Sequence, residues 1–443
     1  MMDSPQSASL SVEELHEVWP VLSIDERLEG FRLLPTSVAD DFFLDLSARE
    51  QAELITHLPA SERRTWVRLL PPDDLADLVQ AVAVEPGQAD AILAQLDDAS
   101  RREVNVLLAY AEDDAGGLMN PRFARVRPEM TIDEAIGYLR KQAREKVETV
   151  YYAYALDAEQ RLQGVLSLRQ LFQAASDKKV ADVMQHDVVT VSENTDQEVV
   201  SQLFTEHGFM ALPVLDEQNR MKGIVTVDDI VDVVQEEATE DIQKVGGMEA
   251  LEAPYFEVGF FGMLKKRIGW LLVLFLGQML TATAMSSFEG AIERAVVLSL
   301  FVPLIISSGG NSGSQASTLI IRALALGEMR LKDWWRVARR EVLSGLVLGF
   351  VLGAVGLARI VVWQEVSGAY GEHAFLLGCA VALSVLGVVT FGTLAGSMLP
   401  LVLRRFGFDP ASASAPFVAT LVDVSGVVIY FTVASLLLRG TLL

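Results

Sequence analysis

The sequence predicts a multidomain membrane protein with an all-α N-terminal solenoid, a tandem pair of α/β domains and a five-helix transmembrane domain. Three observations predict it: acidic charge confined to the front half, an internal repeat in the middle, and five long apolar segments at the end. The predicted parts are an acidic helical N-domain over 1–117, a first α/β domain over 118–178, a second over 179–236, a connecting helix over 237–263 and the transmembrane domain over 264–443.

Charge separates the two halves of the chain. Residues 1–250 contain 48 Asp and Glu against 22 Lys and Arg, whereas residues 251–443 contain 11 against 14. This balance does not suggest a basic nucleic-acid surface. The single cysteine, Cys379, permits no disulfide within the chain and indicates no zinc cluster. The first 20 residues lack the layout of a signal peptide, so we expect the acidic half in the cytosol.

The acidic N-domain reads as a run of short helices. Between residues 10 and 115, apolar residues recur at intervals of three and four, and "LP" and "PP" pairs interrupt the pattern. This predicts a small helical solenoid.

The middle of the chain repeats itself. "LQGVLSLRQLF" at 162–172 aligns with "MKGIVTVDDIV" at 221–231, and each copy has a β-α-β-β-α rhythm. The pair resembles tandem cystathionine-β-synthase (CBS) domains, which often bind adenosine nucleotides. That family's ribose-binding pattern, Thr/Ser-x-x-Asp, is present as Thr226 to Asp229, but the first copy has Gln170 after Ser167. A purely structural, dimerising role is the alternative.

Five apolar segments are each long enough to span a bilayer, at approximately 268–287, 295–326, 341–363, 375–402 and 411–438. Basic residues cluster before the first segment, between the second and third, and between the fourth and fifth; the other loops hold only Arg294 and Arg359. Because basic loops face the cytoplasm, we expect the N-terminus inside and the C-terminus outside an inner (cell) membrane.

The second segment is unusual for a spanning helix. Pro303 and the pair Gly309-Gly310 are expected to weaken it, and Asn311 and Gln315 place polar groups at membrane depth. These features suit either close helix packing with polar contacts or a segment that lines a pore. In the third and fourth segments, glycines recur every four residues, which predicts smooth faces for helix contact.

The last segment contains an acid, Asp423, that costs roughly 2.5–3.5 kcal/mol to insert. No Lys, Arg or His lies at mid-depth in the five segments to pair with it. Two interpretations stay open: a protonated or hydrogen-bonded acid that only holds helices together, and an acid on an ion path whose missing counter-charge is a proton or a metal cation. Two copies on a two-fold axis, the commonest symmetry, neutralise one divalent ion. Hydrated Mg²⁺ suits such a site because it needs only one or two carboxylates.

A second acidic feature lies before the first span. If residues 229–241 are helical, their acids share one side at spacings of three and four, where like charges repel. The alternatives are a solvated face and a cation sensor that packs when Mg²⁺ screens the charges. These acids are Asp229, Asp232, Glu236, Glu237, Glu240 and Asp241.

Taken together, the chain resembles the MgtE family of magnesium channels over nearly its whole length. The motifs that carry the resemblance are "EDDAGGLM", "PLIISSGGNSGSQASTLIIRALALGEM" and "DPASASAPFVATLVDVSGVVIYF". The family implies a homodimer with its pore on the dimer axis, and a hydrated Mg²⁺ held by Asp423 beside the Ala419 carbonyl. It also implies regulatory Mg²⁺ sites and possible ATP binding at the CBS domains. The matching regulatory positions are Asp73, Asp196, Glu198, Asp229, Asp232, Glu237, Glu240 and Asp241.

The sequence thus predicts a Mg²⁺-selective channel for magnesium uptake that closes when cytosolic Mg²⁺ is plentiful. It predicts no enzyme, since the chain lacks a phosphate-binding G-x-x-x-x-G-K-[ST] loop and an H-E-x-x-H motif. Two alternatives stay open: a broader channel for Mn²⁺ or Co²⁺, and a non-conducting, membrane-anchored nucleotide sensor.

Overall fold

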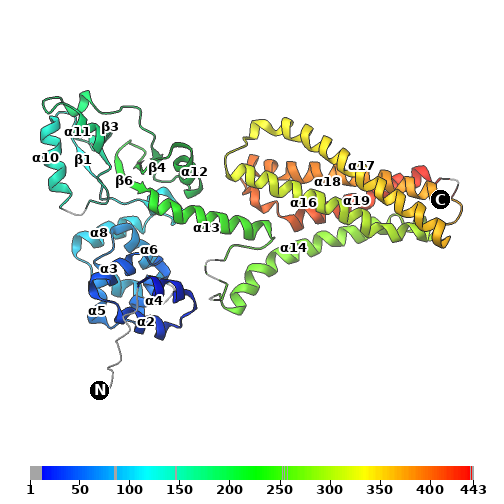
Figure 1. Cartoon of the computed structure of the whole chain (residues 1–443), viewed down its shortest axis with the longest axis horizontal. Coiled ribbons are helices and arrows are strands. Elements are labelled where there is room, and N and C mark those ends of the chain that lie inside the picture. Colours follow the sequence, from blue (N-terminus) through cyan, green and yellow to red (C-terminus); the bar gives the residue numbers. More distant parts are fainter. Residues whose placement is uncertain are drawn as a thin grey trace, which may run out of the picture. The chain divides into compact units, whose positions relative to one another are not determined.

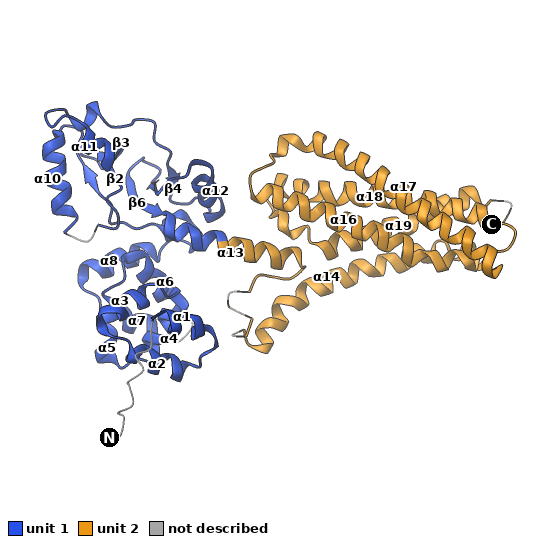
Figure 2. Ribbon diagram, viewed as in Figure 1, with its two compact units in different colours: residues 1–234 blue, residues 235–443 orange. Residues whose placement is uncertain are grey.

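The computed structural model describes residues 12–83, 87–144, 147–251, 253, 255–256, 258–439 and 441. The chain divides into two compact units, residues 1–234 and 235–443 (Figure 2). Each unit is described by itself below. We call them unit 1 and unit 2.

Unit 1 begins with a run of short helices that matches the predicted solenoid. Pro35 and Pro59, the prolines of the "LP" pairs, directly precede two of these helices, and Pro72 occupies the first turn of another. Proline is tolerated there because the first turn needs no intrahelical N–H bond. Phe42 and Phe43 are fully buried at the centre of the helical core. The elements are α1 (Val12–Val18), η1 (Trp19–Val21), α2 (Ile24–Leu33), α3 (Thr36–Leu44), α4 (Ala48–His57), α5 (Ala60–Val67), α6 (Pro72–Val82), α7 (Gln88–Leu93) and α8 (Asp98–Leu107).

Two similar α/β domains complete unit 1 (Figure 1). Their sheets have the strand orders β1-β2-β3 and β4-β5-β6, each with one parallel and one antiparallel pair. The first domain follows α9 (Ala115–Leu118) and contains β1 (Arg125–Val126), α10 (Ile132–Gln142), β2 (Tyr152–Leu156), β3 (Leu162–Ser167) and α11 (Leu168–Gln173). The second contains η2 (Val180–Asp182), β4 (Val191–Ser192), α12 (Gln197–His207), β5 (Ala211–Leu215), β6 (Met221–Thr226) and the start of α13 (Val227–Val245).

Helix α13 begins and ends earlier than the predicted connecting helix. It begins at Val227 and runs without a break across position 236, at which the sequence predicts the end of the second α/β domain. It ends at Val245, well before position 263, and the next long helix begins at Phe260. Residues 252, 254 and 257 of the predicted connecting segment lie outside the described residues. One helix therefore carries both the first and the last acids of the predicted sensor.

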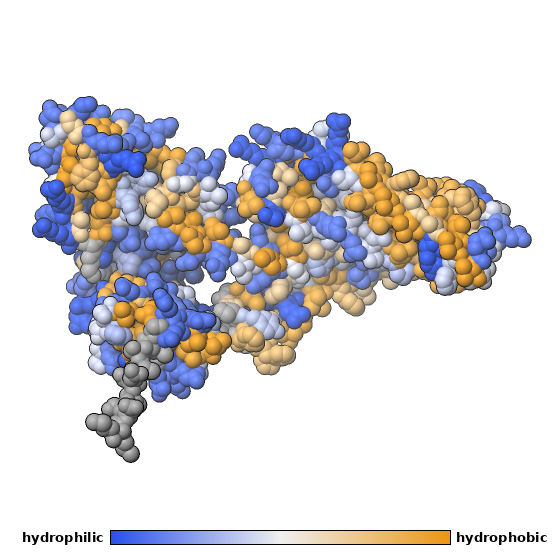
Figure 3. Space-filling model, in the orientation of Figure 1, coloured by the Kyte–Doolittle hydropathy of each residue, from blue (hydrophilic) through white to orange (hydrophobic). Residues whose placement is uncertain are grey.

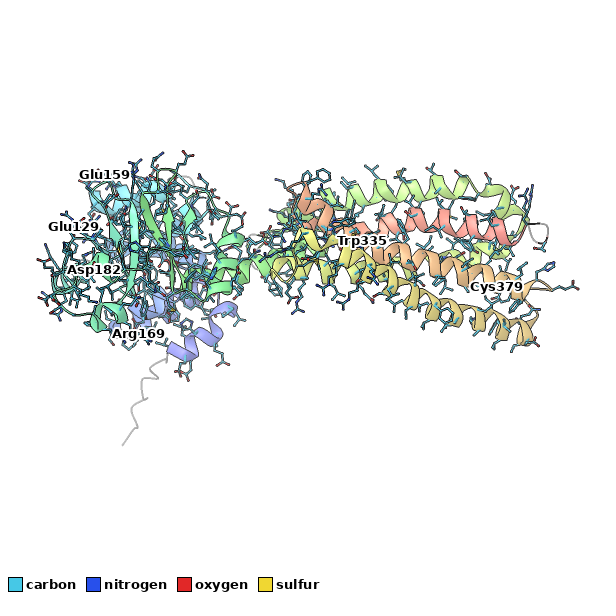
Figure 4. The ribbon with its side chains drawn as sticks, turned by 90° about the horizontal axis from the view of Figure 1, so that it is seen from above. Glu129, Glu159, Arg169, Asp182, Trp335 and Cys379 are labelled. Carbon is cyan, nitrogen blue, oxygen red and sulfur yellow. The ribbon has the colours of Figure 1, made fainter. Side chains whose placement is uncertain are left out.

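Unit 2 contains five helices that are long and apolar enough to cross a membrane. Figure 3 shows broad hydrophobic patches over them, and Figure 4 labels Trp335 and Cys379 towards opposite ends of the bundle. The elements are α14 (Phe260–Ser286), α15 (Glu289–Arg294), η3 (Val296–Phe301), α16 (Val302–Ala325), η4 (Leu331–Asp333), α17 (Trp334–Ser367), α18 (Ala374–Arg405), η5 (Pro410–Ser412) and α19 (Ala415–Leu437). The predicted fold class is confirmed in all three of its parts.

The expectation that Pro303 and Gly309-Gly310 weaken the second span is wrong. Helix α16 is continuous, because Pro303 lies in its first turn. Gly309 and Gly313 are buried against α18. A Cβ on Gly313 would lie 2.9 Å from the carbonyl oxygen of Gly392. The glycines let two backbones approach closely while the helix remains intact.

The predicted glycine faces of the third and fourth spans are confirmed. A Cβ on Gly349 would lie 2.8 Å from Cα of Leu386, and a Cβ on Gly353 would lie 2.7 Å from the carbonyl oxygen of Ala382. Helices α17 and α18 therefore pack backbone to backbone, as small-residue spacings in membrane helices favour.

Candidate ion pathway and acidic clusters

Asp423 lies near the middle of α19 and is half-buried within unit 2. The side-chain amide of Gln278 on α14 donates a hydrogen bond of 2.9 Å from Nε2 to Asp423 Oδ2. The two residues are 145 positions apart in the sequence. The carboxylate thus has a neutral hydrogen-bond donor beside it, which holds its orientation without cancelling its charge.

Helix α14 comes close to α19 because of a glycine next to Gln278. A Cβ on Gly277 would lie 2.8 Å from Thr420 Cγ2, so a larger residue would push the helices apart. Two turns earlier, Trp270 Nε1 donates to Ser414 Oγ at 3.1 Å, at the start of α19. These contacts fix the position along α14 and α19 at which the Gln278 amide meets the Asp423 carboxylate.

Ala419 lies one turn before Asp423 and faces α16. A Cβ on Gly310 would lie 3.6 Å from the Ala419 Cβ, an ordinary van der Waals contact. Because α19 is continuous, the Ala419 carbonyl accepts the helical bond from residue 423, and its second lone pair stays available to water.

A polar stripe runs along the exposed side of α16. Its polar members are Ser307, Asn311 and Gln315, which follow the apolar Pro303 at intervals of four, and all four residues are exposed within unit 2. Residues spaced by four share one face of a helix. Polar groups that face hydrocarbon are costly, so this face needs water or protein against it.

In unit 1, the first turns of α6 and α13 bring acids together. We call this group the Asp73 cluster. Its members are Asp73, Asp74, Glu148, Asp228, Asp229 and Asp232. The Asn120 amide lies between two of them and donates to Asp73 Oδ1 at 3.0 Å and to Glu148 Oε2 at 2.7 Å.

Crowding raises the proton affinity of the Asp73 cluster. Burial, and then the neighbouring Asp228 and Asp232, raise the pKa of Asp74 to about 6. Burial and neighbouring acids raise the pKa of Asp229 to about 7, although hydrogen bonds from Thr226 oppose the shift. Burial, Asp229 and Asp74 raise the pKa of Asp73 well above its usual range. Protons or cations therefore stabilise this arrangement.

The structure places Asp196 and Glu198 elsewhere in unit 1. Asp196 caps α12, where its Oδ1 accepts a 2.8 Å hydrogen bond from the backbone N–H of Glu198. Its backbone pairs with Asp114, whose pKa is raised by burial and by the charges of Asp113 and Asp196. The predicted regulatory acids of unit 1 thus fall into two groups.

A further acidic group lies in unit 2, where the end of α13 meets the connection between α18 and α19. We call it the Asp241 cluster; it comprises Glu237, Glu240, Asp241, Lys244 and Asp409. Burial, followed by Asp409 and Glu237, raises the pKa of Asp241 to about 6. Lys244 Nζ lies 2.6 Å from Asp409 Oδ2 and also pairs with Glu240. Burial lowers the pKa of Lys244, but these two partners outweigh it and raise the pKa overall.

Within the described residues, no three His, Cys, Asp or Glu side chains are arranged to ligate one metal ion directly. Mg²⁺ does not require such a cage, because it keeps several of its waters and binds through one or two carboxylates.

The two predicted nucleotide motifs have the same local geometry. Thr226 Oγ1 donates to Asp229 Oδ2 at 2.6 Å, and Ser167 Oγ donates to Gln170 Oε1 at 3.0 Å. Each motif joins the last strand of its sheet to the following helix. Asp229 therefore serves both this local bond and the Asp73 cluster.

Sequence reasoning missed several residues of these sites. Lys244 follows Glu240 by four positions and Asp241 by three, so its pairing was readable from helical spacing. Asp409 lies in a basic loop, and Gln278 has no charge that would mark it as a partner of Asp423. Asp74, Asp228 and Glu148 carry no comparable signal.

The fold and these sites define a multi-pass membrane protein with one hydrogen-bonded acid in its last span, an exposed stripe of polar residues on a neighbouring span and clusters of acids outside the spans. The sequence matches the family model for the MgtE divalent cation transporter over residues 302–433. It matches the MgtE intracellular N domain over 10–113 and CBS domains over 115–177 and 180–236.

Relatives match over most of their length. The chain is 42% identical to the magnesium transporter MgtE of Thermus thermophilus over 435 residues, covering 97% of this chain and 94% of the relative. It is 36% identical to the magnesium transporter MgtE of Enterococcus faecalis, covering 76% of this chain and 72% of the relative. The chain belongs to the MgtE family.

A solved structure with similarity to half of the chain is the cytosolic domain of the Mg²⁺ channel MgtE in complex with ATP. It is 43% identical, covers 50% of this chain and 90% of its own, and has a TM-score of 0.47.

Proposed function

We propose that this protein is a Mg²⁺-selective channel for magnesium uptake, and that its ion route passes Asp423 on the two-fold axis of a homodimer. Asp423 carries the proposal, because it is an acid at mid-span whose partner is a neutral amide. The exposed polar stripe of α16 and the names of the relatives support it. A second copy against this stripe covers its polar groups and supplies the second carboxylate.

In this proposal, the Asp423 carboxylate attracts a hydrated Mg²⁺ and accepts hydrogen bonds from its waters. The Ala419 carbonyl, one turn away, accepts another. Pro303, Gly310, Asn311 and Gln315 line the route, with Gly309 behind them against α18. Inward flow follows the membrane potential, which supplies roughly 4.6 kcal/mol per 100 mV to a divalent ion.

The experiment is Mg²⁺ influx into liposomes that contain the purified full-length protein. We expect influx with the unmodified chain and a loss of at least about 100-fold with Asp423→Asn, which keeps the size of the side chain and removes its charge. Equal influx through the folded variant would refute the proposal.

We propose that cytosolic Mg²⁺ closes the channel. The Asp73 cluster, Asp196 with Glu198, and the Asp241 cluster gather acids whose packing cations stabilise. Asp232, Glu237 and Glu240 contribute to these groups. Val245, at the end of α13, packs with Ile321 and Ala413 of the transmembrane domain, so cation binding beside it reaches the spans directly.

The proposed orientation places both acidic clusters in the cytoplasm, with the C-terminus outside. The basic residues near the start of α14, between α16 and α17, and at the end of α18 support it. Labelling single cysteines in a Cys379→Ser background from either side of the membrane tests this orientation.

A broader divalent channel is the second candidate, and the description of the family model favours it. Competition of Mn²⁺ and Co²⁺ with Mg²⁺ influx separates the two, because softer ions accept direct ligation more readily. A non-conducting nucleotide sensor predicts no influx at all.

ATP is a proposed ligand of the α/β domains at Thr226 and Asp229. The motif is present in the second domain, but its acid already bonds to Thr226. Titration of ATP into the full-length protein, with Asp229→Asn as the comparison, tests this site.

A further inference from the structure

The hydrogen bond from Gln278 engages one of the two carboxylate oxygens of Asp423. Gln278 Nε2 donates to Oδ2 at 2.9 Å, and a hydrogen bond to a charged acceptor is stronger than one between neutral groups. Each carboxylate oxygen has two lone pairs, so a cation that binds both oxygens of Asp423 directly need not expel this amide, but it competes with the amide for electron density and space at Oδ2. An ion that binds through its own water does not.

We propose that Gln278 is a positioning residue that sets the ion selectivity of the channel. By holding one oxygen of Asp423, it opposes bidentate binding of a dehydrated cation and leaves the acid to act through water. This inference rests on the proposed function, in which the permeant ion passes Asp423.

Mg²⁺ and Ca²⁺ bind carboxylates differently, so a comparison of the two ions tests the proposed role of Gln278. Ca²⁺ takes carboxylates in monodentate or bidentate fashion at 2.3–2.6 Å with flexible geometry. Mg²⁺ releases its waters reluctantly. A Ca²⁺ ion that takes both oxygens weakens the charge-assisted hydrogen bond from Gln278, which is stronger than the bond to water that replaces it. The penalty therefore falls on Ca²⁺ and spares hydrated Mg²⁺.

The surrounding contacts between α14 and α19 hold Gln278 beside Asp423. Gly277 allows α14 to touch Thr420, one turn from Asp423. Trp270 bonds to Ser414 on one side, and the rings of Phe288 and Phe431 stack at 5.2 Å on the other. Because Gln278 lies between these contacts, α14 and α19 stay packed together when the amide group of Gln278 is replaced.

The experiment measures Mg²⁺ and Ca²⁺ influx through the full-length protein in liposomes. Gln278→Met keeps the length of the side chain and removes the donor. Gln278→Asn keeps the amide but is one methylene too short to reach, so it tests the same bond if the first variant does not fold. Trp270→Phe is the matched control, because it removes a different hydrogen bond between the same two helices.

We expect both Gln278 variants to lower the Mg²⁺/Ca²⁺ influx ratio by about tenfold, and Trp270→Phe to leave it within about twofold. An unchanged ratio in a Gln278 variant that still conducts Mg²⁺ would overturn the inference. An equal fall in Trp270→Phe would also overturn it, because helix packing would then set the ratio. Absence of Mg²⁺ influx through the unmodified protein would instead contradict the proposed function.

Discussion

Lys244 contributes a positive charge to the Asp241 cluster that the chain itself supplies. Its ammonium lies between Glu240 and Asp409, so it joins the end of α13 to the connection before α19. In the proposed gating, the cations that close the channel add to this built-in contact. Lys244 then sets how much further positive charge is needed to hold the end of α13 in its packed position.

We predict that Lys244→Gln raises the internal Mg²⁺ concentration that half-closes the channel by about fivefold. The packed arrangement loses a partly buried ion pair worth ~1 kcal/mol, and more Mg²⁺ has to replace it. Patch recordings with stepped internal Mg²⁺ measure the shift. Lys244→Arg, which keeps the charge, is the control. A half-closing concentration that stays the same or falls in Lys244→Gln would contradict this role.

The residues of the proposed ion site are only partly predictable from the sequence. Asp423 is a candidate because an unpaired acid in an apolar segment is costly. Its contact with Gln278 is not predictable, because the two lie 145 positions apart and nothing in the pattern indicates which polar groups of different helices meet. The same limit applies to Glu148, which Asn120 joins to Asp73 of α6.

At the scale of elements, glycine faces determine how closely the spanning helices pack. Along α17, the nearest neighbours of a new Cβ differ sharply from one glycine to the next. At Gly349 the Cβ would lie 2.8 Å from the backbone of Leu386, whereas at Gly356 the nearest atom is 3.9 Å away on Val381. Two glycines of one helix therefore provide a matched pair.

We predict that Gly349→Ala lowers the thermal unfolding temperature of the protein in detergent by several degrees. The added methyl group forces α17 away from α18, and overpacking typically costs about 1–3 kcal/mol. Gly356→Ala should leave the temperature unchanged or raise it slightly, because alanine favours a helix over glycine. Equal effects of the two substitutions would show that the face does not control packing.

Span length and hydropathy located all five long helices, but they misplaced several ends. The third span begins at Trp334 instead of 341, and the first begins at Phe260 instead of 268. The missed turns carry Lys, Arg and Trp, as helix ends at a membrane interface commonly do. Hydropathy alone reads such turns as loops. The continuity of α16 was missed for a different reason, since glycine was judged by its propensity and not by its packing.

Across the whole molecule, the excess of acidic residues in the front half makes the stability of the folded state depend on pH and on cations. The pKa of Asp74 rises to about 6 and that of Asp229 to about 7, both from a reference value of 3.8. At pH values between the reference pKa and these raised pKa values, the folded Asp73 cluster thus binds more protons than the same residues do in the unfolded chain. The resulting stabilisation is present at low pH and is lost as pH rises through about 6 to 7.

We predict that, without Mg²⁺, the backbone amides of α6 and of the first turns of α13 exchange hydrogen more slowly at pH 5.5 than at pH 8, after correction for intrinsic rates. Mg²⁺ should slow exchange strongly at pH 8 and only weakly at pH 5.5, because protons already neutralise the acids. Hydrogen–deuterium exchange of the full-length protein measures this. The double variant Asp73→Asn/Asp229→Asn should lose most of the pH dependence. If Mg²⁺ slowed hydrogen exchange equally at pH 5.5 and at pH 8, that result would count against the Asp73 cluster as a cation sensor.

In the proposed channel, two copies of Asp423 share one hydrated divalent ion. A structure of the full-length protein in lipid with Mg²⁺, at a resolution that shows the waters around the ion, tests this. We predict one Mg²⁺ on a two-fold axis between the two Asp423 carboxylates, surrounded octahedrally by water at about 2.0–2.1 Å, with water between ion and protein and with Gln278 still bonded to each acid. Two Asp423 side chains that are far apart, or that face lipid with no metal between them, would contradict the account.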